Sequence, residues 1–433
     1  MSKRARPRPR SDPRLTPANA GRAASVAAPV FAGSIAPVEP RLWLLAVLLL
    51  AGLLLALHGG VLGWPFVSDD FVFLTASRHP AQLFTSFDVY SNYFRPISRE
   101  LYFFVGQLLA GNHPLPYHLF NFVLLLTIIA MLVRLGDRLG GPRAGLLAGA
   151  IYTLLYSNRM LMAWVSCSQD LLAACFALAA AHSLLAGHRG RAAAWHLAAL
   201  LSKESVAAYP LVHALWRFVD APPGTPWRRR LGNAGRESAP LWAATLVWAV
   251  IVVSVRTVRH AWARGQNTPI ADVTLSVGSL WEGMRSALLS YVALEQPWST
   301  ITRAACDLRA AWLSLATGLV AVLLLTALSR RFAVRGVTRG APDPMLVLGG
   351  LWAFVGAVPV ALAGHHFSAY YITFSGIGFS LWGGGAACKA TADRLRCARR
   401  TFGTRTRCEP RGPVQRRAAG TRFGSVLRHD QAT

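Results

Sequence analysis

The sequence predicts an all-α polytopic membrane protein, and its composition and the length of its apolar runs carry that prediction. Hydrophobic residues make up 53% of the 433 residues and charged residues only 15%, whereas soluble domains carry about 25% charged residues. The missing charge is concentrated in runs such as 42–57, 238–255, 310–328 and 344–364. Each run approaches the roughly 20 apolar residues that an α-helix needs to cross a bilayer. One soluble core could not bury them all.

The net charge of +26 would suit a nucleic-acid partner, but its distribution argues against one. Residues 1–41 carry eight Lys and Arg against two acidic residues, and residues 388–433 carry twelve against three. The two tails therefore supply more than half of the net charge. The other basic residues gather between apolar runs, as is typical of cytoplasmic loops. No groove-reading motif accompanies the charge, so we expect no nucleic-acid partner.

The alternation of apolar runs and basic loops predicts about ten hydrophobic segments, some short or broken. A disordered basic N-terminus (1–41) and a basic low-complexity tail (388–433) are expected in the cytoplasm, on either side of a transmembrane domain at 42–387. The predicted segments are 42–62, 114–134, 144–157, 165–186, two half-helices within 192–217, 238–256, 307–328, 344–363 and 369–387.

Two connections are too long to be simple turns, and the charge bias puts both on the outer side. The first outer loop covers 63–113, and within it residues 97–109 (ISRELYFFVGQLL) have apolar residues at helical spacing. That pattern predicts a helix lying along the membrane interface. The second outer loop covers 257–306, with an amphipathic stretch at 280–294. The basic segment 227–236 (WRRRLGNAGR) is expected as an inner loop.

The stretch 192–217 is interrupted by SKES (202–205) and is too short for two full crossings. Because it starts and ends at basic loops, we predict two half-helices that meet at a tip inside the membrane. Such a break is tolerated where it lines a cavity or is buried in protein. Charged residues at membrane depth are costly and usually mark a function. Either Lys203 and Glu204 neutralise each other, or Lys203 balances a phosphate that Glu204 orients.

Two adjacent acids, Asp69 and Asp70, follow the first apolar helix by a few residues. They are interpreted as a solvated loop start, as the start of a helix with Ser68 in the N-cap, or as a catalytic carboxylate. Two neighbouring acids close to a low-dielectric surface raise the pKa of one of them. A carboxylate with a raised pKa can act as a general base toward a hydroxyl group.

Other polar residues at segment ends each have two interpretations. The guanidinium of Arg95, in YFRPIS (93–98), suits phosphate oxygens or extends to lipid headgroups. Asp170 opens an apolar helix and either stabilises its dipole or contacts substrate. His365, His366 and Tyr370, together with Tyr371, lie at an outer helix end. They are either an interfacial belt or substrate contacts.

The cysteines show neither a CxxC pair nor a metal-binding spacing. We therefore assign no disulfide and no zinc site to Cys167, Cys175, Cys306, Cys388, Cys397 and Cys408.

Four of these motifs, in this order, resemble a known family. VSDDF (67–71), YFRPIS (93–98), GNHPLPYHLFNFVLLL (111–126) and LLSKES (200–205) are similar to segments of the GT-C membrane glycosyltransferases. Within that group the chain resembles the bacterial relatives of the dolichyl-phosphate-mannose protein O-mannosyltransferases. The resemblance covers about 42–220, with a looser similarity at HHFSAYY (365–371). At the position of Gln169 that family often has an Arg.

The resemblance implies a GT-C-like fold and a hexosyltransferase, mannosyltransferase-like activity. A sugar would pass from a polyprenyl-phosphate donor to the hydroxyl of a protein, lipid or glycan acceptor outside a bacterial inner membrane, with inversion. Asp69 or Asp70 would act as the base, Asp69 being favoured as the first acid after the helix. Arg95 and Lys203, with Glu204, would bind the donor phosphate. A divalent cation, Mg²⁺ or Mn²⁺, is an alternative source of positive charge.

Two other classes of protein remain open at this point. A transporter or flippase of lipid-linked glycans would explain a broken helix with charges near the membrane midplane. It would leave unexplained a long outer loop with an acidic pair and an interfacial helix. A non-catalytic membrane scaffold would tolerate the loss of Asp69 and Asp70.

Overall fold

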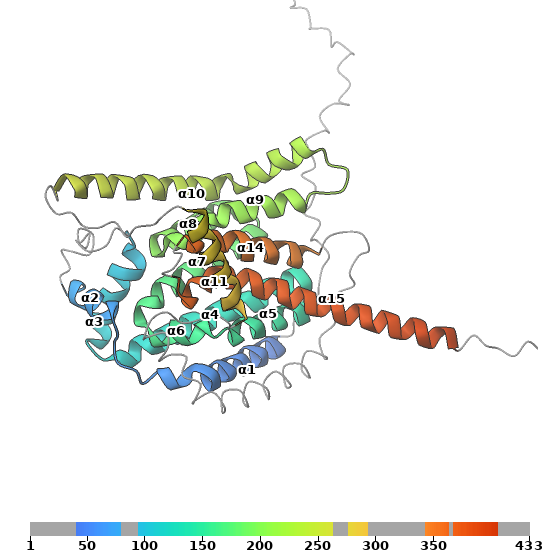
Figure 1. The fold of residues 1–433 in the computed structure, drawn as a ribbon, viewed down its shortest axis with the longest axis horizontal. Helices are drawn as coiled ribbons and strands as arrows, with labels where there is room; N and C mark the ends of the chain where they lie inside the picture. Colours follow the sequence, from blue (N-terminus) through green and yellow to red (C-terminus); the bar gives the residue numbers. More distant parts are fainter. Residues whose placement is uncertain (1–39, 79–93, 263–275, 293–342, 363–366, 406–433) are drawn as a thin grey trace, which may run out of the picture.

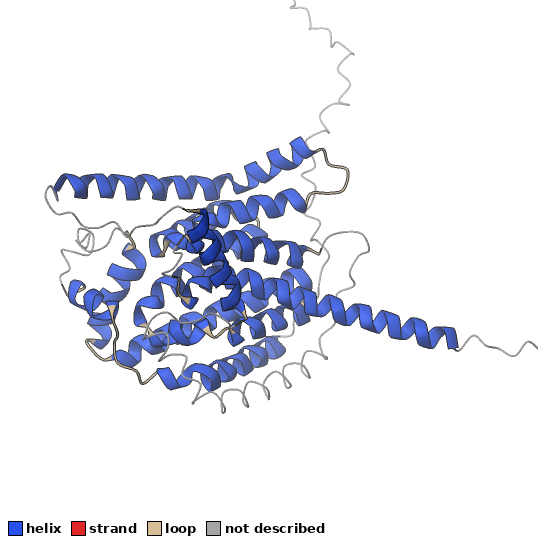
Figure 2. Cartoon of the chain, in the orientation of Figure 1, coloured by secondary structure: helices blue, strands red, loops and turns tan. Residues whose placement is uncertain are grey.

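A computed structural model describes residues 40–78, 94–262, 276–292, 343–362 and 367–405. Every regular element in these ranges is a helix (Figure 2), which confirms the all-α prediction. The elements are α1 Pro40–His58, η1 Gly59–Val61, α2 Asp69–Ala76, η3 Pro96–Leu101, α3 Tyr102–Ala110, α4 Pro114–Gly140, α5 Pro142–Leu154, α6 Ser157–Ala163, η4 Val165–Cys167, α7 Ser168–Leu185, α8 Arg189–Ser202, η5 Glu204–Ala208, α9 Tyr209–Val219, α10 Trp227–Trp262, α11 Val277–Tyr291, α14 Pro344–Ala361, η8 Ala369–Ile372 and α15 Thr373–Arg405.

Within the described ranges, five helical segments are long and apolar enough to cross a membrane. They are Pro40–Val61, Pro114–Gly140, Val165–Leu185, Trp227–Val255 and Pro344–Ala361. By length and composition, the chain is therefore an α-helical membrane protein. The expected segment at 307–328 lies outside the described residues.

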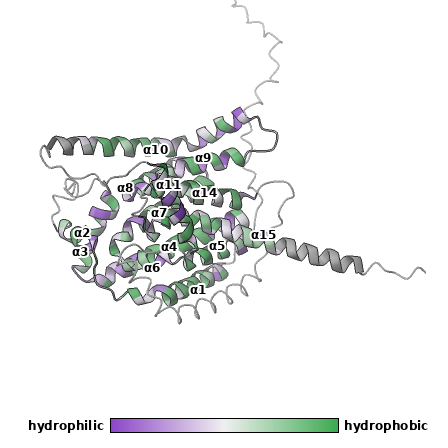
Figure 3. Ribbon diagram, viewed as in Figure 1, coloured by the Kyte–Doolittle hydropathy of each residue, from purple (hydrophilic) through white to green (hydrophobic). Residues whose placement is uncertain are grey.

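The centre of the bundle is formed by α4, α5, α7, α14 and α15, and green, apolar residues run through it in Figure 3. Glycines allow the closest approaches between these helices. A Cβ on Gly349 of α14 would lie 2.4 Å from the backbone nitrogen of Trp382 in α15, and a Cβ on Gly145 of α5 would lie 2.3 Å from the carbonyl oxygen of Val133 in α4. Larger residues at these positions would force the helices apart.

The two ends of the bundle differ in charge and in structure. The α2 and α3 helices lie together at one end, and the C-terminal part of α15 projects from the opposite end (Figure 1). The connection between α9 and α10 and the start of α10 lie at the same end as that projection (Figure 1), and Arg228 and Arg229 in the first turn of α10 are exposed. The basic start of α10 and the C-terminal part of α15 therefore lie at the end opposite to α2 and α3.

Two helices extend beyond the limits that the sequence predicted. The α10 helix begins at Trp227, so the basic stretch 227–236 is its first part rather than a loop. Arg, Leu, Ala and Glu in this stretch are good helix formers, and positive charge alone does not end a helix. The α15 helix likewise continues past 387 to Arg405.

The break in the stretch 192–217 is present where the sequence placed it. The α8 helix ends at Ser202, Lys203 is extended with φ −161° and ψ 137°, and η5 follows from Glu204. A second helix, α9, then starts at Tyr209 with Pro210 in its first turn, a position that proline favours. The helix expected over 97–109 is present as η3, which is a π-helix, followed by α3. The expected amphipathic helix is present as α11.

Candidate functional site

Arg95 joins three separate segments of the chain. Its Nε donates to Oε2 of Glu204 at 2.9 Å, and its second terminal nitrogen donates to the other carboxylate oxygen of Glu204. Its remaining terminal nitrogen donates to Oε1 of Gln169 at 2.5 Å. Pro96 follows Arg95 directly and starts η3, while the backbone of Arg95 itself is non-helical. This local geometry turns the guanidinium toward η5 and α7.

Lys203 forms a second, more enclosed ion pair. Its Nζ lies 2.7 Å from each carboxylate oxygen of Asp170, and both residues are buried. The same Nζ lies 5.1 Å from the ring centres of Tyr370 and Tyr371, within the range of a cation–π interaction. Asp170 and Tyr370 therefore contact Lys203 and surround its charge.

Lys203 and Glu204 do not neutralise each other, although they are adjacent. Because Lys203 is extended, successive side chains point to opposite sides of the backbone. Lys203 reaches Asp170, and Glu204 reaches Arg95. The interpretation that Lys203 and Glu204 neutralise each other is therefore wrong. Asp170 provides the negative charge that faces Lys203, in addition to its place in the first turn of α7.

The adjacent acids Asp69 and Asp70 have opposite surroundings. Asp69 is exposed and accepts a hydrogen bond from Oγ of Ser68 at 3.3 Å. Asp70 is 0% exposed. Its Oδ1 accepts from the backbone nitrogen and the hydroxyl of Ser166, at 2.8 and 2.5 Å, and its Oδ2 accepts from the backbone nitrogen of Val67 at 3.0 Å. Asp70 therefore fastens α2 to η4.

Burial raises the pKa of the Asp70 carboxyl, and its hydrogen bonds to Ser166 and Val67 oppose that rise. Ser68 does not cap α2 with its side chain, and the bond from Val67 to Asp70 stabilises this turn in its place. The capping interpretation thus names the wrong residue. The sequence attributed such a rise to the neighbouring acid, whereas the pKa of Asp70 is raised by burial.

His118 and Asn121, in the segment 111–126, form hydrogen bonds with backbone carbonyl groups. The two ring nitrogens of His118 lie 2.7 and 3.0 Å from the carbonyl oxygens of Met162 and Trp64. Nδ2 of Asn121 donates to the carbonyl oxygen of Leu161 at 3.1 Å. These contacts hold α6 and η4, and with them Ser166, against α4. The sequence shows that these residues are polar within an apolar helix, and their partners become visible only in the fold.

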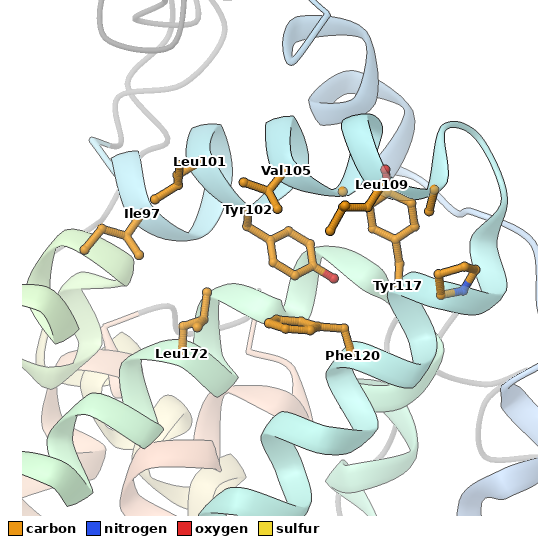
Figure 4. A pocket seen from close by; sticks show the side chains of 11 residues that line it. Ile97, Leu101, Tyr102, Val105, Leu109, Tyr117, Phe120 and Leu172 are labelled. Atoms are coloured by element: carbon orange, nitrogen blue, oxygen red, sulfur yellow. The ribbon is translucent and has the colours of Figure 1, made fainter.

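A partly open cavity of about 290 Å³ lies between α3, α4 and α7 (Figure 4). Its wall is apolar apart from two tyrosines. Ile97 and Leu172 line it, and each is two residues away from a residue of the ion pairs, Arg95 and Asp170. The lining residues are Ile97, Leu101, Tyr102, Val105, Gly106, Leu109, Ala110, Pro116, Tyr117, Phe120 and Leu172.

Tyr102 links this cavity to the acidic pair. Its ring projects into the cavity beside Phe120 (Figure 4), and its hydroxyl lies 3.3 Å from Oδ1 of Asn121. Burial and then the charge of Asp70 raise the pKa of Tyr102, so the two groups are electrostatically close. The sequence does not predict this cavity. The apolar residues at helical spacing in 97–109 do predict the helix that forms one of its walls.

Some expected site residues are not brought into this cluster. His365 and His366 lie outside the described residues. Among the residues that the structure does describe, no three or more His, Cys, Asp or Glu are grouped so as to hold a metal ion. Cys167, Cys175 and Cys388 are buried free thiols.

Together, the fold and this cluster define a helical membrane protein with one buried and one partly exposed ion pair beside an apolar cavity. No protein-family model, no curated protein and no solved structure matches the chain. Its function must therefore be argued from the residues themselves.

Proposed function

We propose that this protein is a GT-C-type glycosyltransferase that uses a polyprenyl-phosphate sugar. The observation that carries the proposal is the meeting of three chemically different parts. Cationic groups at Arg95 and Lys203, carboxylates at Asp69 and Asp70, and the apolar cavity all adjoin the turn from η4 into α7. Ser166, which binds Asp70, lies four residues before Asp170, about one helical turn.

The cavity suits the first carbons of a lipid tail. Ligand cavities are concave and mostly apolar, with a few polar groups that orient the ligand. Here the apolar wall starts at Ile97 and Leu172, next to the charged residues. A phosphate held near Arg95 would have its hydrocarbon chain directed along α3 and α4.

In the proposed reaction, an aspartate of the pair removes the proton from the acceptor hydroxyl. The acceptor oxygen forms a bond to the anomeric carbon as the bond from that carbon to the phosphate oxygen breaks. Polyprenyl phosphate leaves with the bonding electrons, and the anomeric centre inverts. Arg95 and Lys203, or a bound divalent cation, would stabilise the charge on the leaving phosphate. Asp170 and Tyr370 would hold Lys203 in position.

The proposed orientation puts the acceptor outside, on the periplasmic side of a bacterial inner membrane, and both termini in the cytoplasm. The exposed arginines at the start of α10 and the basic end of α15 lie opposite to α2 and α3 (Figure 1). Basic segments favour the cytoplasmic side. The proposed topology of about ten segments includes two half-helices, α8 and α9, that meet near Lys203.

A transporter of lipid-linked glycans is the second candidate, and the enclosed pair of Lys203 and Asp170 at a helix break favours it. Charged groups beside discontinuous helices are common at transport sites. A transporter would move the lipid without breaking the bond from the sugar to the phosphate. The two candidates therefore differ in their chemical product.

The decisive experiment incubates the purified chain in lipid nanodiscs with polyprenyl-phosphate sugars and measures release of polyprenyl phosphate by mass spectrometry. Donors and acceptors to test would come from comparing the glycolipids and glycoproteins of deletion and wild-type strains. Arg95→Gln should abolish release. Arg217→Gln is the matched control, because Arg217 is also paired with a glutamate, Glu237, but away from the cavity. Movement of intact donor across the membrane without release would favour the transporter.

A further inference from the structure

The charges of the two ion pairs at the candidate site balance one another. Arg95 and Lys203 supply two positive charges, and Glu204 and Asp170 supply two negative charges. Each cation is thus already paired with a carboxylate inside the protein. An incoming phosphate would bring further negative charge to a neutral cluster, so tight binding requires that one of the carboxylates moves away.

The two ion pairs differ in how firmly the carboxylate is enclosed. The side chain of Asp170 is 4% exposed and lies in the first turn of α7, whereas that of Glu204 is 37% exposed. Their cationic partners are similarly buried, at 8% for Lys203 and 12% for Arg95. Glu204 is therefore the carboxylate that can turn toward solvent, and Asp170 would have to leave a closed environment.

We infer that Glu204 occupies the place of a lipid phosphate on Arg95 and is displaced when that phosphate binds. The inference rests on the proposed function for the identity of the ligand as a lipid with a phosphate headgroup. Lys203 and Asp170 remain paired throughout. This assigns Glu204 a role opposite to phosphate binding, because its carboxylate competes with the ligand.

The geometry of Arg95 supports such an exchange. The guanidinium donates two hydrogen bonds to the carboxylate of Glu204, and the same planar fork can donate to two phosphate oxygens. An exchange of carboxylate for phosphate would leave the number of charged hydrogen bonds on Arg95 unchanged. The remaining terminal nitrogen donates to Gln169. This bond would keep the guanidinium in its orientation while phosphate replaces the carboxylate. Loss of the Glu204 carboxylate without a replacement would take a charged partner from a partly buried guanidinium, which is unfavourable.

The position of the cavity adds a second reason. Ile97, two residues after Arg95, lines its wall. A phosphate that replaced the Glu204 carboxylate could therefore keep its alkyl chain in apolar surroundings. An inorganic phosphate would gain the charged contact alone and should bind more weakly than an alkyl phosphate.

The test uses decyl phosphate and the full chain in nanodiscs, with binding measured by isothermal titration. Glu204→Gln removes the competing charge and should tighten binding at least ~10-fold. Arg95→Gln should abolish binding. Glu237→Gln is the matched control, since Glu237 pairs with Arg217 in the same way but away from the cavity, and it should leave affinity unchanged. Binding by Glu204→Gln that equals or falls below that of the wild type would overturn the inference.

A milder variant covers the case in which Glu204→Gln does not fold. Glu204→Asp keeps the charge on a shorter side chain, so its contact with Arg95 weakens, and it should bind decyl phosphate more tightly than the wild type. Equal or weaker binding by Glu204→Asp would count against the inference in the same way. Inorganic phosphate and decyltrimethylammonium serve as probes of the charge and the chain alone, and both should bind more weakly than decyl phosphate.

This assay contains neither sugar nor acceptor, so it separates the two claims. Tighter binding to Glu204→Gln without any sugar transfer by the wild type would sustain the inference and contradict the proposed function. Sugar transfer by the wild type with no gain of binding in either Glu204 variant would sustain the function and overturn the inference.

Discussion

The ammonium of Lys203 lies 2.7 Å from both carboxylate oxygens of Asp170, a residue 33 positions earlier in the chain. Glu204, the immediate neighbour of Lys203, pairs instead with Arg95. Two neighbours in sequence thus belong to two ion pairs of different exposure. This separation decides what each substitution should do.

Lys203→Gln should destabilise the protein strongly, because it leaves Asp170 as a buried charge without its partner. The expected loss is about 3–5 kcal/mol in the free energy of unfolding. Reversible unfolding in mixed micelles would measure it. The double change of Lys203→Gln with Asp170→Asn should recover much of the loss, and Lys389→Gln at an exposed position should have little effect. If Lys203→Gln unfolds with the same free energy as the wild type, the pair of Lys203 and Asp170 does not stabilise the fold.

Asp69→Asn should reduce sugar transfer by at least ~100-fold, the usual scale for a general base, with little change in stability. Asp69 is exposed and accepts only the bond from Ser68 among its described contacts. Turnover would be measured in nanodiscs, and thermal unfolding would report stability. If Asp69→Asn keeps normal turnover and Asp70→Asn loses it, the base is Asp70. Normal turnover in both would exclude a base at this pair.

Asp70→Asn should lower the melting temperature, in contrast to Asp69→Asn. The Asp70 carboxylate accepts bonds from Ser166 and Val67, and an amide group would turn its NH₂ toward one of these donors. A buried donor left without an acceptor costs about 1–3 kcal/mol. Ser166→Ala should give a smaller loss, because it removes one donor and leaves the backbone bond. Equal melting temperatures for both aspartate variants would contradict the role of Asp70 in joining α2 to η4.

Asp70 should also give stability a specific pH dependence. Its folded-state pKa is raised above the usual 3.8 by burial, so the folded state holds the proton more tightly than the unfolded state. Its contribution is therefore most favourable below pH 3.8 and is lost as the pH rises through the folded-state pKa. Subtracting the unfolding free energy of Asp70→Asn from that of the wild type, across pH 3–8, isolates this contribution. A difference that grows with rising pH would contradict the sign.

Val105→Trp should weaken binding of decyl phosphate by at least ~10-fold, because the added ring fills space that the alkyl chain would use and each buried CH₂ contributes about 0.8 kcal/mol. Val105 lines the cavity, as Figure 4 shows. Leu108→Trp is the control, since Leu108 lies on the same helix, is 70% exposed and is not part of the lining. Equal effects of both changes would mean that the cavity does not hold the chain.

Single-cysteine labelling would test the orientation. Arg78→Cys, after α2, should react with an impermeant thiol reagent from outside, and Arg229→Cys, at the start of α10, only from inside. Both positions are exposed. All six native cysteines should first be replaced by Ala, including the buried Cys167, Cys175 and Cys388. Labelling of both positions from the same side would reverse or abolish the proposed outer site.

The sequence by itself determined that this is an α-helical membrane protein and where the helix break at SKES lies. Runs of apolar residues are local signals, because a bilayer demands about 20 of them in succession. The break at SKES, the helix after Pro96 and the amphipathic helix α11 are also local, since proline and polar residues act on their own backbone. The sequence does not predict the helical extensions at 227–236 and beyond 387, because basic residues occur in helices as well as in loops.

Only the tertiary structure decided which charges meet. Arg95 with Glu204 and Lys203 with Asp170 join residues that are 109 and 33 positions apart, and no spacing rule specifies such contacts. The different surroundings of Asp69 and Asp70 likewise depend on Ser166, which packing brings to one of them. Ion pairing and burial are properties of three-dimensional position. The sequence could therefore name the charged residues, but the fold alone chose their partners and the exposure of each pair.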